Sequence, residues 1–103
     1  MSNQDDLVIN QYLSRLKAKT QNINGVFFFG SRVKGTNHKW SDYDLCVVSP
    51  DFGKDRVAEI TSLLMVGADM DENIEPHPMS VEEFNDPNND LAREIRRTGI
   101  KVL

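Results

Sequence analysis

The sequence predicts an α/β or α+β domain in which helices cover a β-sheet. Two short apolar runs, residues 26–29 and 45–48, are followed by a glycine or by Ser-Pro, which is typical of strands buried on both faces. Stretches with a helical spacing of apolar residues precede, separate and follow these runs. A chain of 103 residues that is 39% hydrophobic can form one modest core, so we expect a single domain over residues 1–103.

The first half of the chain is expected to form a helix and then two strands. Residues 5–20 read as an amphipathic helix, because apolar side chains recur with helical spacing at Leu7, Val8, Ile9, Tyr12, Leu13 and Leu16. The segment 22–25 breaks this pattern before the first strand. The second strand begins at Tyr43 and stops before Pro50, because proline cannot donate to a strand ladder.

A second helix and a third extended segment should follow. The helix is predicted from an apolar stripe that we expect to pack against the sheet, formed by Val57, Ala58, Ile60, Leu64 and Met65. Gly67 suits the left-handed residue just beyond a helix end. Residues 70–79 are expected to be extended, and their two prolines, Pro76 and Pro78, favour a position at the sheet edge.

The C-terminal part should be helical up to Gly99. Ser80 and Glu83 have the spacing of a capping box, and Asp86-Pro87 has the pattern of a helix start. Leu91 and Ile95 supply the apolar positions of the last helix, and residues 100–103 are predicted to add a short strand.

Charge and composition exclude several classes of protein. A net charge of -4 argues against long nucleic acid as a partner that this chain binds alone, because that affinity comes from clustered Lys and Arg. No apolar run approaches the roughly 18 residues that span a membrane, and the acidic N-terminus is unlike a signal peptide. The single Cys46 lies inside an apolar run, which fits packing in a reducing compartment. We therefore expect a cytoplasmic protein without a membrane partner.

Two aspartates at the start of the second strand carry the clearest chemical signal. Residues i and i+2 of a strand lie on one face, so Asp42 and Asp44 can direct both carboxylates to one place, while Tyr43 between them packs on the other side. Two such carboxylates can share a pair of divalent ions, as in two-metal displacement at phosphorus. The alternative is a strand-start cap at Asp42 and a buried, hydrogen-bonded acid at Asp44.

A glycine-rich turn between the two strands is the predicted phosphate site. Gly30 would let a ligand approach the backbone, and Ser31 would offer its hydroxyl and nearby N–H groups to a triphosphate. Arg32 and Lys34 could neutralise phosphate oxygens, or could be solvated turn residues. The alternative for Gly30-Ser31 is a structural helix cap. Thr36-Asn37 follows Gly35 where a Walker motif requires Lys and Ser or Thr, so this is not a Walker P-loop.

The segments Gly30-Ser31-Arg32-Val33-Lys34-Gly35 and Ser41-Asp42-Tyr43-Asp44-Leu45 together resemble the signature of the minimal nucleotidyltransferase family, within the DNA polymerase beta-like superfamily. Ten residues separate Ser31 from Asp42, with a strand before the first motif and another after the second. Residues 91–100 also look like the closing helix of such domains. The resemblance covers residues 23–103 as a nucleotidyltransferase core and leaves the N-terminal helical segment, 1–22, outside it.

The resemblance implies a mixed sheet of the polymerase beta palm type, a nucleoside triphosphate donor, for which we expect ATP, and Mg²⁺, as two ions, held by Asp42, Asp44 and a third carboxylate. Glu75 stands where the family usually has aspartate, so it is the candidate metal ligand or general base; a solvent-facing edge residue is its alternative. Asp69 and Asp71 are possible substitutes. The implied reaction is in-line attack by an acceptor hydroxyl on the α-phosphorus, with pyrophosphate leaving.

The resemblance also suggests an acceptor. Stand-alone family members often pair with a HEPN-domain toxin and transfer AMP to one of its tyrosines, which makes the chain a possible antitoxin. A catalytically weak domain that neutralises or scaffolds its partner by contact is the main alternative. A small-molecule nucleotidyltransferase is a weaker one, because such enzymes normally carry extra substrate-binding structure.

Three other residues are interpreted without a catalytic role. His38 and His77 lack the spacing of a zinc site and are expected to be loop or surface residues. Trp40 either stacks on a nucleotide base or closes its loop over the core, and the sequence does not choose between the two.

Overall fold

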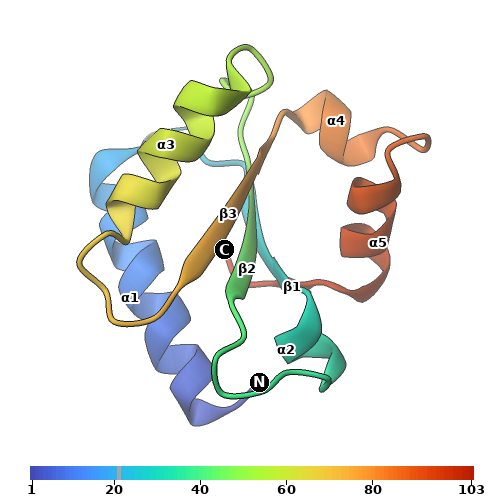
Figure 1. Ribbon diagram of the computed structural model, residues 1–103. Helices are drawn as coiled ribbons and strands as arrows, with labels where there is room; N and C mark the ends of the chain where they lie inside the picture. The colour runs from blue at the N-terminus through green and yellow to red at the C-terminus, as the bar shows by residue number, and fades with distance from the viewer. Residues whose placement is uncertain (21) are drawn as a thin grey trace.

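A four-stranded mixed sheet forms the centre of the computed structural model, which describes residues 1–20 and 22–103 (Figure 1). The strands are β1 (Gly25–Phe29), β2 (Tyr43–Val48), β3 (Ile74–Met79) and β4 (Ile100–Lys101), in the order β3-β2-β1-β4. β1 is antiparallel to both of its neighbours, and β2 is parallel to β3. Gln21, in the segment 1–22 predicted to precede the core, lies outside the described residues.

Helices cover both faces of this sheet. Helices α1 (Asn3–Lys19) and α3 (Arg56–Val66) lie on one face, and α4 (Val81–Asn85) and α5 (Asp90–Thr98) lie on the other, while α2 (Ser31–Lys34) is a single turn after β1 (Figure 1). Side chains of β2 alternate between the two faces: Tyr43, Leu45 and Val47 belong to the core beneath α1 and α3, and Cys46 and Val48 to that beneath α5. The sequence prediction of a sheet covered by helices is therefore confirmed.

Most predicted elements are present close to their expected bounds. β1 and β2 are buried on both faces, and β3, with its two prolines, is an edge strand as predicted. Ser80 caps α4 through a complete capping box with Glu83. Tyr12 and Tyr43 are both buried packing residues, and the Tyr12 hydroxyl donates to the Leu63 carbonyl over 2.7 Å.

The predicted apolar stripe of α3 is wrong. Val57, Leu64 and Met65 are exposed, and α3 instead buries Leu63 and Val66. Residues 63–66 are all apolar, so the hydrophobic pattern does not define a single face of this helix.

Two helix boundaries also differ from expectation. Gly67 has a φ of -106° and is not left-handed; a Cβ added there would lie 3.2 Å from two atoms of the Tyr12 ring, which is a tight contact. Asp86-Pro87 does not begin a helix, because Asp86 closes a turn by accepting from the Asn88 amide. The last helix begins after Asn89, whose side chain accepts from the Ala92 amide.

None of the helices in the described ranges combines the length and the apolar character that crossing a membrane requires.

Candidate active site

The start of β2, the start of β3 and the end of β1 meet at one end of the sheet. In the parallel pair, Asp44 of β2 lies beside Glu75 of β3. In the antiparallel pair, Asp44 lies opposite Phe29, the last residue of β1, so the turn at Gly30 adjoins the same carboxylate. The strand register therefore brings together three segments that are far apart in the sequence.

The acidic side chains lie where the helical cover of the sheet ends. On the face beneath α4 and α5, β3 presents Met79, His77 and Glu75 in succession. Met79 is buried, whereas the His77 and Glu75 side chains are 25% and 52% exposed. This end of the face is open, so a ligand can reach its polar groups without any helix moving.

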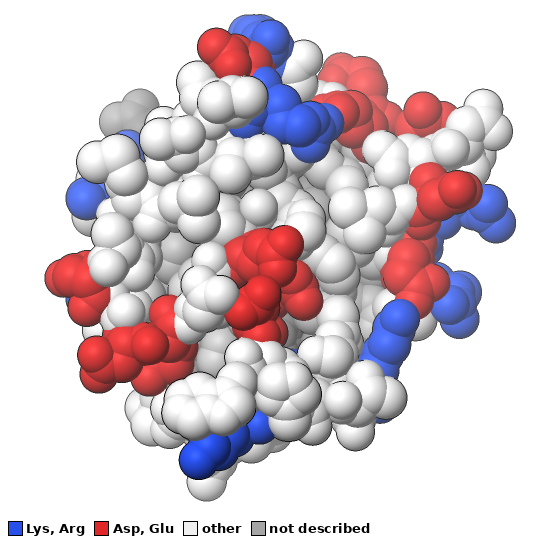
Figure 2. Space-filling model, viewed as in Figure 1, with Lys and Arg blue, Asp and Glu red and all other residues white. Residues whose placement is uncertain are grey.

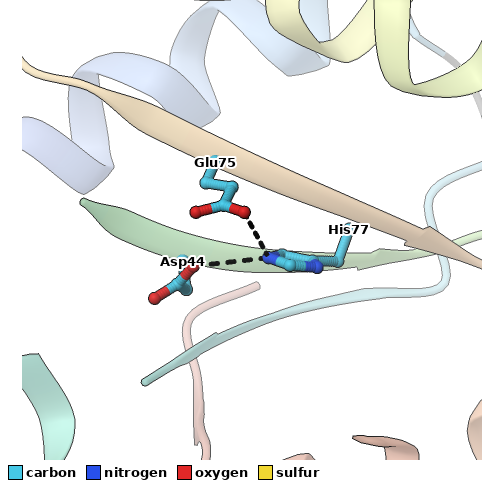
Figure 3. A group of neighbouring side chains, drawn as sticks. All are labelled: Asp44, Glu75 and His77. Carbon is cyan, nitrogen blue, oxygen red and sulfur yellow. Dashed lines mark hydrogen bonds and ion pairs between the residues drawn. The ribbon is translucent and has the colours of Figure 1, made fainter. Parts of the chain in front are cut away.

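Asp44, Glu75 and His77 point toward one another (Figure 3). His77 Nε2 lies 3.3 Å from Asp44 Oδ1 and 3.9 Å from Glu75 Oε1. One donor atom from each of the three residues lies within 4.8 Å of the other two, an arrangement that could hold a metal ion. The residues present therefore fit a divalent cation.

A third carboxylate adds to the negative charge of this cluster. A hydrogen bond with the Asp42 carboxyl, partial burial and the charge of Asp44 raise the pKa of Glu75 above its ordinary value, against a smaller opposing effect of His77. The charge of the metal-free cluster is thus incompletely compensated. A divalent cation would provide that compensation.

Asp42 is tied to the loop before β3, beside a cleft that Asp42, Asp44 and Glu75 do not line. Asp42 Oδ1 accepts from Asn73 Nδ2 over 2.5 Å, which links the loop before β2 to the loop before β3. A cleft of about 420 Å³ lies beside this link, between the two loops and the start of α1. Trp40 lines this cleft and is 76% exposed, so it does not close its loop over the core.

Gly30 is fixed by its backbone conformation and by Asp44. Its φ of +89° and ψ of -158° form a combination that side chains rarely allow. A Cβ added at Gly30 would also collide with the Asp44 carboxylate. The position therefore requires glycine, because the Asp44 carboxylate fills the space that a side chain would take.

Ser31 begins α2 directly beside this space. The Gly30 carbonyl accepts from the Val33 and Lys34 amides, each over 3.1 Å, which closes the single turn. The first amides of a helix have no acceptor within the helix, so those of Ser31 and Arg32 can serve an anion. A phosphate role for Gly30 and Ser31 remains a prediction.

Most hydrogen-bond donors of the Arg32 guanidinium are used within the protein. Its Nε and Nη2 donate to the Ser41 carbonyl over 3.0 and 2.9 Å, and its guanidinium lies 4.0 Å from the centre of the Tyr43 ring. Arg32 Nη1 also lies 3.5 Å from Asp5 of α1. This side chain thus connects α1, α2 and the loop before β2, and phosphate binding by Arg32 stays a prediction.

The other charged candidates lie apart from the carboxylate cluster. Lys34 forms a 3.0 Å ion pair with Glu94 of α5, so its predicted phosphate contact would require this pair to open. Asp69 pairs with Arg15 of α1, and Asp71 lines the cleft. Neither aspartate belongs to the group formed by Asp44, Glu75 and His77.

His77 is the site residue that the sequence interpretation missed. It is a half-buried strand residue rather than a loop or surface residue, whereas His38 lies in an exposed loop as expected. The missed signal was the i, i+2 spacing from Glu75, the same rule that paired Asp42 with Asp44.

The charge distribution on this face supports a cation-binding role. Acidic side chains gather at its centre, over the strands β2 and β3, with uncharged residues around them, and the Lys and Arg side chains lie toward the edges (Figure 2). A polyanion such as a triphosphate would need bound cations to approach this centre.

Comparison with known proteins agrees with this arrangement. The family model for polymerase beta nucleotidyltransferases matches residues 9–103, beginning inside α1 and so earlier than the motif resemblance. One similar structure, of a toxin-antitoxin with AMP-PNP, has a TM-score of 0.60 and 18% identity, with 91% of this chain and 71% of that chain covered.

A second similar structure is a putative nucleotidyltransferase from Sulfolobus solfataricus, with a TM-score of 0.66 and 17% identity, covering 92% of this chain and 76% of that chain. At such identities the likeness establishes the fold, and the predicted nucleotidyltransferase fold is confirmed. A comparison with curated proteins found no match.

Proposed function

This chain belongs to the polymerase beta nucleotidyltransferase family, and on that premise we propose that it is a metal-dependent enzyme that moves AMP from ATP to an acceptor hydroxyl. The observation that supports the proposal is the group of Asp44, Glu75 and His77 at the end of the sheet, with Asp42 near enough to raise the pKa of Glu75 and with Asp44 against the Gly30 backbone. A purely structural role would not require three acids at one open end of a sheet, because their mutual repulsion disfavours the charged state.

The donor nucleotide would use both parts of the site. The amides at the start of α2 and the Ser31 hydroxyl would donate to phosphate oxygens. Asp42, Asp44 and Glu75 would hold divalent metal, which supplies positive charge to the triphosphate and to the charge that develops during transfer. The exposed Trp40 beside the cleft is the candidate for stacking on the base.

The transfer itself balances as a substitution at phosphorus. The acceptor oxygen forms a bond to the α-phosphorus, the bond from that phosphorus to the bridging oxygen breaks, and pyrophosphate leaves with the bonding electrons. The acceptor proton passes to a carboxylate, and Glu75 is the candidate because its half-exposed side chain lies beside Asp44, where an acceptor can reach it.

For the acceptor we propose a tyrosine hydroxyl on a HEPN-type toxin, which gives the chain an antitoxin role. The structural similarity to a toxin-antitoxin with AMP-PNP supports both a nucleotide and a protein partner. The open position of Glu75, half of whose side chain is accessible, would admit a side chain from another protein.

One observation favours neutralisation of a partner by contact alone. Val57, Leu64 and Met65 have the spacing of one helix face and are 77%, 47% and 67% exposed, and an exposed apolar patch is a feature of protein-contact surfaces. On this alternative, binding to the partner would be independent of the carboxylates.

A transfer assay separates the two functions. ATP labelled at the α-phosphate is incubated with Mg²⁺ or Mn²⁺, this chain and a HEPN-domain protein encoded in the same genome. Label should reach the partner with the wild type and with the control Asp90→Asn, which changes an exposed acid on α5, and should not with Asp44→Asn. A stable complex without transferred label would support the contact-only alternative and contradict the enzymatic proposal.

A further inference from the structure

The His77 imidazole occupies a position that the family motifs do not assign. It lies on β3 two residues beyond Glu75, on the same face, and its Nε2 faces both Asp44 and Glu75 (Figure 3). We propose that His77 is a direct ligand of the metal at this site, so that the site takes a divalent transition ion such as Mn²⁺ in preference to Mg²⁺. The inference rests on the proposed function for the metal role of Asp44 and Glu75.

The spacing of the donor atoms fits ligation of a common ion. Ligands placed about 2.1 Å from an ion lie roughly 3.0–3.4 Å apart when they are adjacent in an octahedral or tetrahedral shell. The distances from His77 Nε2 to Asp44 Oδ1 and Glu75 Oε1 are 3.3 and 3.9 Å. The distance to Asp44 is already within this range. Rotation of the half-exposed Glu75 side chain would shorten the distance to Glu75 into the same range.

The fold holds the imidazole in this orientation. Its neighbour across the parallel pair is Cys46, which is fully buried, so the strand cannot shift without disturbing the core. The rings of His77 and Phe29 pack edge to face, with their centres 5.0 Å apart. Phe29 is itself buried at the end of β1. The ring is thus supported on its apolar side while Nε2 faces the carboxylates.

A nitrogen donor changes which ion the site prefers. Mg²⁺ binds oxygen ligands and keeps much of its water shell, whereas imidazole is a common ligand of first-row transition ions. Two carboxylates alone would suit Mg²⁺. An imidazole added to the carboxylates should contribute little to Mg²⁺ affinity and should favour an ion that accepts nitrogen.

The competing role for His77 is that of a positioning residue that only hydrogen-bonds to Asp44. The two roles differ in a spectroscopic property. A nitrogen bonded to Mn²⁺ receives spin density from the ion, whereas a nitrogen that only hydrogen-bonds to a ligand receives far less. They also differ in ion selectivity. A residue that orients Asp44 should affect the affinities for Mn²⁺ and Mg²⁺ by similar factors.

The test uses the purified chain after removal of metal, titrated by calorimetry with MnCl₂ or MgCl₂ and without nucleotide. The wild type should bind Mn²⁺ at least ~10-fold more tightly than Mg²⁺. In His77→Gln, which keeps a side chain able to hydrogen-bond to Asp44, Mn²⁺ affinity should fall ~10-fold or more while Mg²⁺ affinity changes little. His38→Gln, in the exposed loop, is the matched control and should behave as the wild type.

Pulsed EPR on the Mn²⁺ complex reports directly on a bond between the ion and nitrogen. A directly bonded ¹⁴N coupling is expected, and it should disappear in His77→Gln. Absence of that coupling, or equal losses of Mn²⁺ and Mg²⁺ affinity in the variant, would overturn the proposal. If His77→Gln still transfers label in the presence of Mg²⁺, the proposed nucleotidyltransferase function does not depend on His77 as a metal ligand.

Discussion

Glu75 experiences a conflict of charge at the open end of the sheet, because its carboxyl interacts with those of both Asp42 and Asp44. Its hydrogen bond with Asp42, its partial burial and the charge of Asp44 raise its pKa. The folded, metal-free protein therefore disfavours the ionised form of Glu75 relative to the unfolded chain. A bound cation should reverse this preference.

The pH dependence of stability follows from this shift. The contribution of Glu75 to the stability of the metal-free protein should be fully present below its unfolded pKa and be lost as pH rises through the raised folded pKa. In EDTA at neutral pH, Glu75→Gln should therefore have a higher Tm than the wild type. The gain in the free energy of unfolding should be under about 1 kcal/mol, because the side chain is half exposed.

Thermal melts in EDTA and in excess Mn²⁺, across pH 4 to 8, measure this effect. The cation should stabilise the wild type and not the variant, so the order of the two Tm values should invert. Glu82→Gln, on the exposed surface of α4, is the control. A lower Tm for Glu75→Gln than for the wild type in EDTA would contradict the account of charge repulsion.

Individual site residues differ in how far the sequence could predict them. The two-residue repeat of a strand predicts that Asp42 pairs with Asp44, and this pairing stays a prediction, because Asp42 lies just before β2 and outside the group of Asp44, Glu75 and His77. Placing Glu75 beside Asp44 depended on a family resemblance, since the register of a parallel pair joined through α3 is not a local property. The local engagement of Arg32 was also beyond the sequence, because it depends on the path of the loop carbonyl at Ser41.

At the scale of elements, the turn from β1 into α2 sets the geometry of the site. Gly30 and Gly35 flank α2 and both have positive φ, but only Gly30 approaches another residue closely. Nothing lies within 4 Å of a Cβ built at Gly35. The two glycines therefore allow backbone strain to be separated from collision with Asp44.

Alanine substitutions at these two positions should have different consequences. Gly35→Ala should cost about 1–2 kcal/mol of stability, from left-handed strain alone, and leave metal binding unchanged. Gly30→Ala should cost more and reduce Mn²⁺ affinity at least ~10-fold, because the new methyl group displaces the Asp44 carboxylate. Denaturant unfolding and calorimetry measure both; a Gly30→Ala variant that binds Mn²⁺ normally would refute this view of the turn.

The elements themselves were more predictable than their orientation. Buried strands and the Ser80 cap have local signals that the structure confirms. The face that α3 turns to the core was predicted wrongly, since four consecutive apolar residues, 63–66, surround much of the helix. The start of α5 was misplaced because Asp86-Pro87 and Asn89 both have cap-like chemistry, and only the turn between them decides which one is used.

Across the whole molecule, the two faces of the sheet differ: one forms only core, and the other forms core and carries the candidate site. The face beneath α1 and α3 holds the larger core, joined by the hydrogen bond from Tyr12 to Leu63. The face beneath α4 and α5 is apolar at one end and acidic at the other, so the same strands anchor the fold and present the site. The packed core at the apolar end of this face stabilises the fold and offsets the charge repulsion at the acidic end.

The most direct test of metal-dependent nucleotide binding is a calorimetric titration of the purified chain with ATP, with Mg²⁺ or Mn²⁺ and then with EDTA. We predict binding by the wild type and by Asp90→Asn only when a divalent ion is present, and none by Asp44→Asn, whose fold is checked by its melting transition. ATP binding that is equal with and without metal, or that survives in Asp44→Asn, would contradict the assignment of these carboxylates as the metal-dependent donor site.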